Sequence, residues 1–363
     1  MPEVWIPYGS VETLVTIQAE NLGELIEPRA DEAQVQVQQL DELSGTSLVF
    51  IGDTKPTTLE LVRSLLGRDG SSALRFCTRD TKRVESSLPE LKGRLLEPSQ
   101  DTVKTAGGFS ISSSIFAAGS KLVIATAQPD PLFGIVDARV RCALDFVNGA
   151  WEGAAAARKD YEPTPFERTE SYDLLDGAVR DVADIRFVTI VPRGGRAGAV
   201  LVDPSFDDVR GSFYSCGVSQ SKAMVVGVGG AGYDDTLSGA LRTVWSVLEG
   251  VRKSGELLVV AECSRGLGSR ALELLVTGRL GEEGRGRGKY VEGLEEVFYL
   301  NKLKQEYDVM LLSGLPEVYA KTKLGFSTAK GSAEALAKLL TKLGRTSKVN
   351  VVTRACECKV RSA

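Results

Sequence analysis

The residue whose setting first suggests chemistry is Asp130, which lies between Pro129 and Pro131. An uninterrupted apolar run, residues 122–125 (LVIA), precedes it and is typical of a strand buried on both faces of a parallel sheet. Proline fixes its own φ and disfavours helix for the residue before it, so Asp130 is expected on a turn where this strand ends. Ligands of open α/β sheets bind at that edge. The sequence therefore predicts a pocket beside Asp130.

A second candidate group, Asp53, Thr54 and Lys55, follows the apolar run 47–51 (SLVFI). A helix is predicted over residues 57–66, with Thr54 as its N-cap. A strand that leads into a helix N-terminus can bind an anion, and Lys55 would add a positive charge for a carboxylate or phosphate. The simpler alternative is a capped loop with no ligand.

Further charged side chains follow other predicted strands. The ligand-binding candidates are Asp53, Thr54, Lys55, Arg79, Arg139, Gly230, Asp234 and Asp235, and the catalytic candidates are Asp130, Asp80 and Lys55. Carboxylates that converge in a cleft raise one another's pKa or bind Mg²⁺. Aspartates also cap helices and tight turns, and that alternative stays open for each residue.

The chain has no histidine. It therefore lacks the usual general base near neutral pH and the commonest metal ligand, so Asp, Glu, Lys, Tyr or Cys must carry any proton transfer. Its six cysteines are scattered, which is typical of a reduced cytoplasmic protein. On a strand, Cys356 and Cys358 would face the same side, but no histidine or second cysteine pair completes a zinc site.

Short apolar runs that alternate with helical segments predict an α/β fold with two α/β domains, mainly parallel sheets and a cleft between them. We place the domains at residues 1–210 and 211–363. An acidic connector is predicted to about residue 43, and a helix over residues 237–252. No apolar run reaches the roughly 20 residues that a membrane span needs.

Charge is distributed unevenly, with an acidic N-terminal stretch and a basic region from Lys321 onward. Two solvated faces of opposite sign would explain this, and they could meet a second copy of the chain or another protein. Nucleic acid is disfavoured, because aromatic residues do not interleave with the basic ones.

The motifs together resemble the nickel-pincer lactate racemase (LarA-like) family. Ile6-Pro7-Tyr8-Gly9 matches its opening Pro-Tyr segment, and Gly52-Asp53-Thr54-Lys55-Pro56 matches its Asp-x-Thr-Arg-Pro motif. The stretch 120–140 aligns with its central motif, the stretch 229–235 with its Gly-Gly-Tyr-Pro-x-Asp-Gln motif, and Cys263-Ser264 opens a Cys-Ser-x-Gly-x-Gly turn.

The resemblance also implies losses. Asp130 and Asp80 stand where the family has catalytic histidines, and Lys55 where it has a substrate-binding arginine. Val140 replaces the lysine that anchors the cofactor, and the alanine run 154–157, with Ala156, replaces the nickel-binding histidine. Neither side chain can do this chemistry, so no nickel-pincer nucleotide is expected.

Two functions follow from this resemblance. The first is a pseudoenzyme of the lactate racemase superfamily that binds a small anion and acts in regulation or assembly. The alternative is an isomerase or lyase, a racemase or epimerase of a 2-hydroxy acid for example, that works through carboxylates.

Overall fold

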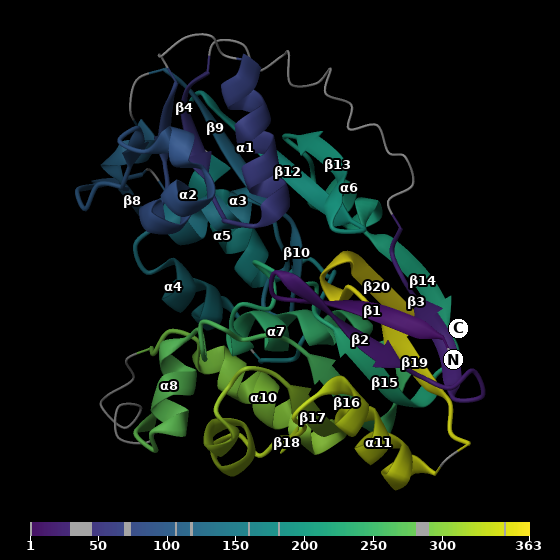
Figure 1. The fold of residues 1–363 in the computed structure, drawn as a ribbon. Coiled ribbons are helices and arrows are strands. Elements are labelled where there is room, and N and C mark those ends of the chain that lie inside the picture. The colour runs from purple at the N-terminus through teal and green to yellow at the C-terminus, as the bar shows by residue number, and fades with distance from the viewer. Residues whose placement is uncertain are drawn as a thin grey trace.

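The computed structural model describes residues 2–29, 46–68, 74–105, 107–116, 119–158, 160–180, 182–280, 290–344 and 346–363. Within these ranges the chain forms two α/β lobes, each built on a six-stranded, mainly parallel sheet with helices packed against it (Figure 1). This confirms the predicted fold class. No helix in the described ranges is both long and apolar enough to cross a membrane.

The sheet of the first lobe has the strand order β13-β12-β9-β4-β5-β6. All its neighbours pair in parallel except β12 and β13, which form an antiparallel hairpin. Its strands are β4 (Thr46–Ile51), β5 (Arg75–Cys77), β6 (Leu95–Leu96), β9 (Ser120–Thr126), β12 (Ile185–Arg193) and β13 (Arg196–Val202). Its helices are α1 (Pro56–Arg68), α2 (Thr81–Ser87), α3 (Ala138–Phe146), α4 (Ala150–Ala157), α5 (Glu170–Arg180) and α6 (Phe206–Ser212).

Strand β9 lies at the centre of this lobe, buried from Lys121 to Thr126 as its apolar sequence predicted. Helix α3 follows it and begins where the Asp137 carboxylate accepts hydrogen bonds from the Arg139 and Val140 amides, at 3.0 and 2.9 Å. The Tyr172 hydroxyl donates to the same carboxylate at 2.7 Å. Helix α3 is thereby fixed with one face toward the carboxyl edge of the sheet.

Two small antiparallel hairpins extend this lobe: β7 (Thr102–Lys104) with β8 (Ser110–Ser112), and β10 (Gln128–Asp130) with β11 (Gly134–Val136). In the second, Asp130 is the last residue of strand β10 and pairs with Gly134, so the turn begins after Asp130 and not at Asp130 as predicted. Gly134 has φ +78°, and a Cβ there would lie 1.8 Å from the Glu167 carbonyl oxygen. Only glycine fits this turn.

The sheet of the second lobe has the order β18-β17-β16-β15-β19-β3, with all neighbours parallel. Its strands are β3 (Leu22–Ile26), β15 (Ser221–Gly227), β16 (Val251–Val260), β17 (Asp308–Leu312), β18 (Ser327–Thr328) and β19 (Val349–Val352). Its helices are α7 (Leu237–Val244), α8 (Arg270–Val276), α10 (Leu294–Glu306) and α11 (Ser332–Leu343). Strands β14 (Tyr214–Val218) and β20 (Cys358–Ser362) pair beside it.

The N-terminal residues pack with the second lobe. Strands β1 (Glu3–Tyr8) and β2 (Val11–Thr16) form a hairpin whose Val4 and Val15 share a buried cluster with Val225 of β15 (Figure 1). Strand β3 pairs with β19, so the predicted acidic connector to about residue 43 was wrong for this part; residues 30–45 lie outside the described residues. The boundary near residue 210 stays a prediction.

Two local predictions also need correction. The helix predicted over residues 237–252 ends at Val244 and continues as a 3₁₀ turn, Trp245–Gly250, because Val251 already pairs with Ser221 in the sheet. Helix α1 begins at Pro56, so Lys55, not Thr54, is the residue that precedes it. The Lys55 carbonyl accepts the first helical hydrogen bond, from Leu59 at 3.1 Å.

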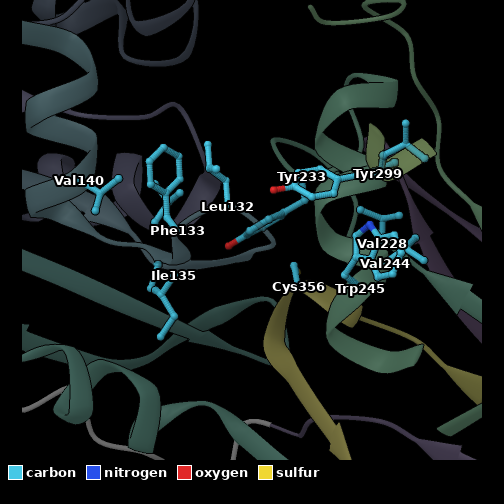
Figure 2. Close-up of a cluster of buried hydrophobic side chains, with 14 of the residues drawn as sticks. Leu132, Phe133, Ile135, Val140, Val228, Tyr233, Val244, Trp245, Tyr299 and Cys356 are labelled. Atoms are coloured by element: carbon cyan, nitrogen blue, oxygen red, sulfur yellow. The ribbon is translucent and has the colours of Figure 1, made fainter. Parts of the chain in front are cut away.

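The lobes share one continuous buried cluster, which includes Phe133 of the first lobe and Val244 of the second. Figure 2 shows both groups of side chains facing each other across the interface.

Candidate functional site

A cavity of about 370 Å³ lies between the two lobes. One wall comes from the carboxyl ends of β4, β5 and β10 and from helix α3, and the other from the N-terminal ends of α7 and α10. This is the sheet edge at which the pocket was predicted. Its volume is at the lower end of the range for ligand sites, about 300–1,000 Å³.

The structure brings most of the predicted site residues to this cavity. Those that line it are Asp53, Thr54, Lys55, Arg79, Asp80, Asp130 and Asp235. Arg139 instead lies 3.8 Å from Asp176 and over the Phe187 ring. Asp234 is buried and accepts the Gly9 amide at 2.9 Å. Gly230 lines a separate cavity near Pro7.

Asp53 and Lys55 form a buried pair at the end of β4, with 3.5 Å between Oδ2 and Nζ. Asp53 also accepts hydrogen bonds from the Lys55 and Thr126 amides, at 2.9 and 2.8 Å. Burial would raise the pKa of Asp53, but the charges of Lys55 and Arg141 outweigh it and hold that pKa below the ordinary value. Burial lowers the pKa of Lys55, against the opposing effect of Asp53. Asp53 thus remains a carboxylate at neutral pH.

Asp130 is only 2% exposed, and both its oxygens are engaged. Oδ1 accepts the Leu132 and Phe133 amides at 2.8 and 3.0 Å, and Oδ2 accepts Nη1 of Arg242 at 2.8 Å. Arg242 belongs to helix α7 of the other lobe, so this contact ties the lobes together. A carboxylate that is saturated in this way is poorly placed to take a proton from a ligand.

Asp80 and Asp235 are engaged as well. Asp80 is the N-cap of α2 and accepts the Arg83 amide at 3.3 Å. Asp235 accepts the Gly232 amide at 2.7 Å and pairs with the Arg83 side chain across the interface. Both carry the helix-capping or turn-forming role that was the alternative in the sequence.

A further carboxylate of the cavity, Asp145, was not among the site residues predicted from the sequence. It lines the cavity from the last turn of α3, and no described residue donates a hydrogen bond to it. Burial raises the pKa of Asp145 to about 6, although Arg141 and Arg79 act in the opposite direction. Its spacing of four residues from Arg141 on one helix was the signal available in the sequence.

Two arginines, Arg141 and Arg79, line the same cavity as Asp145. Among the described residues, no carboxylate lies within 4.0 Å of either guanidinium group. The side chain of Arg141 lies against Gly52 at the end of β4. A Cβ atom added to Gly52 would lie 2.6 Å from the Cγ atom of Arg141. Neither guanidinium group is therefore held in an ion pair with a described carboxylate, although the charge of Asp145 acts on both and that of Asp53 acts on Arg141.

These features define a two-lobed α/β protein with a charged site between its lobes. The fold is similar to that of the lactate racemase apoprotein from Thermoanaerobacterium thermosaccharolyticum, with a TM-score of 0.75 and 14% identity over 99% of this chain and 100% of that one. A protein from Thermotoga maritima is also similar, with a TM-score of 0.55 and 11% identity over 89% of this chain and 96% of that one. The sequence matches no protein-family model and no curated protein. The likeness confirms the predicted fold.

The positions that the resemblance assigns to the pincer cofactor offer no donor atoms. Val140 is 0% exposed and packs in the same apolar cluster as Phe133, as Figure 2 shows. Residues 154–157 are alanines in α4, of which Ala154 and Ala155 are buried and Ala156 is exposed. These side chains do not fit an amine-anchored nucleotide with a histidine-bound metal.

Cys356 and Cys358 do not form a second site. Both are buried and free, and Cys358 donates to the Arg354 carbonyl at 3.2 Å. Burial raises the pKa of both thiols well above the ordinary value, which leaves them unreactive.

Proposed function

We propose that this protein binds a small carboxylate or phosphate between its lobes. The observation that carries the proposal is the pair Arg79 and Arg141, two guanidinium groups at the cavity without a carboxylate of the described chain within 4.0 Å. Guanidinium groups bind planar carboxylates and phosphates through two parallel hydrogen bonds. Lys55 adds a third positive charge, although Asp53 already compensates for it.

We further propose that the protein does not use the nickel-pincer nucleotide. A valine cannot form the covalent link, and an alanine run cannot bind nickel, whatever the fold has in common with a racemase. In this proposal the protein is a pseudoenzyme with respect to nickel-dependent racemisation, and ligand binding serves regulation or assembly. The uneven distribution of charge along the sequence supports a second copy of the chain or another protein as partner, and the six free cysteines support a cytoplasmic location.

The direct test is calorimetric titration of the purified protein with phosphate, lactate and malate. Arg141→Gln should weaken the binding of the preferred anion at least tenfold, since one charge-assisted bidentate contact is lost. Arg139→Gln is the matched control: it removes a cation from the same helix, but outside the cavity, and should leave affinity unchanged. Equal affinities for all three proteins would refute the assignment.

Intact mass and nickel analysis of the same preparation, from cells grown with nickel, test the cofactor proposal. The mass should be that of the unmodified chain, with nickel well below one atom per chain. A covalent nucleotide adduct with bound nickel would overturn it.

A second candidate function is supported by Asp145. A carboxyl group with a pKa of about 6 beside two arginines can take the C2 proton of a bound 2-hydroxy acid and return it. In heavy water such an enzyme would incorporate deuterium at C2 of the acid, and Asp145→Asn would stop this. If the wild type leaves C2 unlabelled, the binding function stands alone.

A further inference from the structure

The carboxylate of Asp145 is a hydrogen-bond acceptor that a ligand in the cavity can reach. No described residue donates a hydrogen bond to it. Its oxygen atoms are nevertheless not sealed from solvent, unlike the unpartnered side-chain oxygens of Glu296 and Tyr299. Asp145 is partly buried and lines the cavity from helix α3. Its oxygen atoms are therefore both accessible and without a partner among the described residues.

Asp145 lies next to the arginines of the proposed anion site. Arg141 precedes it by four residues on α3, and side chains at that spacing have their Cβ atoms about 5–6 Å apart. The charges of Arg141 and Arg79 both act on Asp145, yet neither guanidinium group lies within 4.0 Å of its carboxylate. One small anion can therefore contact Arg141 and Asp145 together, because it has to bridge only a single helical turn.

A carboxylate within an anion site discriminates between anions. The pKa of Asp145 is about 6, so the group is ionised at pH 7.5, and an ionised carboxylate only accepts hydrogen bonds. It repels an anion that has no proton to donate. An anion with a hydroxyl group instead donates a charge-assisted hydrogen bond to it. Asp145 therefore favours anions that carry a proton and acts against anions that do not.

We propose that the ligand is inorganic phosphate, with its charged oxygens at Arg79 and Arg141 and its hydroxyl group donating to Asp145. This rests on the anion site proposed above and chooses among the anions that it could take. Hydrogen phosphate carries the hydroxyl and the charged oxygens on one atom, so it can reach neighbouring side chains at once. Phosphate monoesters lose their last proton at a pKa of about 6, so at pH 7.5 most of an ester has no hydroxyl to donate.

Sulfate is the matched probe, because it has the shape and charge of hydrogen phosphate but no proton to donate. In calorimetric titrations of the full chain at pH 7.5, phosphate should bind about tenfold or more tightly than sulfate. Methyl phosphate should also bind more weakly than phosphate. Asp145→Asn removes the repulsion and supplies an amide group that donates, so this variant should bind sulfate about as tightly as phosphate.

Asp80→Asn is the matched control, because it removes the same charge from the same cavity, and asparagine still caps helix α2. It should strengthen the binding of both ions alike and keep the preference for phosphate. Thermal unfolding of both variants verifies that they are folded.

The outcomes separate this inference from the anion site itself. If the wild type binds sulfate or methyl phosphate as tightly as phosphate, and Arg141→Gln weakens all of them, the phosphate inference fails and the anion site stands. The same holds if lactate or malate binds more tightly than phosphate. If Asp145→Asn keeps the preference, or Asp80→Asn also abolishes it, the role of Asp145 is refuted. If no anion binds to any form, both proposals fail.

Discussion

The pKa of Asp145 predicts how stability depends on pH. The folded-state pKa of about 6 lies above the ordinary value of 3.8, so the ionised carboxylate destabilises the folded protein. The difference corresponds to at most about 3 kcal/mol above pH 7 and to about half of that at pH 5. Solvent reaches part of this side chain and screens its charge, so the measured effect should be smaller than this bound.

Asp145→Asn removes this penalty. Urea unfolding should show the variant to be more stable than the wild type at pH 7.5, by about 1–3 kcal/mol, with a smaller gain at pH 5. Asp53→Asn is the contrasting variant, because the folded-state pKa of Asp53 is lowered: its carboxylate adds stability above its unfolded-state pKa, and that stability is lost as pH falls. If Asp145→Asn gains no stability at pH 7.5, or gains equally at both pH values, the pKa of Asp145 is ordinary and Asp145 is not suited to exchange a proton with a ligand near neutral pH.

Arg242→Met should destabilise the protein by about 3–5 kcal/mol in urea unfolding, because it leaves buried carboxylates without their cation; a loss below about 1 kcal/mol would show that the cluster is not buried in solution. Gly134→Ala should lose about 2–4 kcal/mol, since it combines a positive φ with a clash against the Glu167 carbonyl. Gly93→Ala has a similar φ, +75°, but open space around the Cβ, so it should lose only about 1 kcal/mol; equal losses at the two glycines would contradict the clash.

The parts of the fold that were predictable are those encoded by local apolar patterns. The apolar run of residues 122–125 predicts a buried strand, because a strand at the centre of a parallel sheet needs apolar side chains on both faces. Strand β3 was missed because it lies at an edge: its residues alternate between partly buried and exposed positions, within a stretch whose most visible property is negative charge. Its pairing with β19 joins residues more than 300 positions apart, which no local pattern reveals.

The position of the site could be predicted from the sequence, but its chemistry could not. Strand ends identify which loops gather at a sheet edge, and this brought Asp53, Lys55 and Asp130 to the cavity. What each carboxylate can do depends on the donors around it, and those come from elsewhere in the chain. Asp130 is saturated by Arg242 from the other lobe, whereas Asp145 has no donor among the described residues and a raised pKa. Two aspartates that look equally reactive in the sequence therefore differ, because a partner more than 100 residues away neutralises one of them and leaves the other able to exchange a proton.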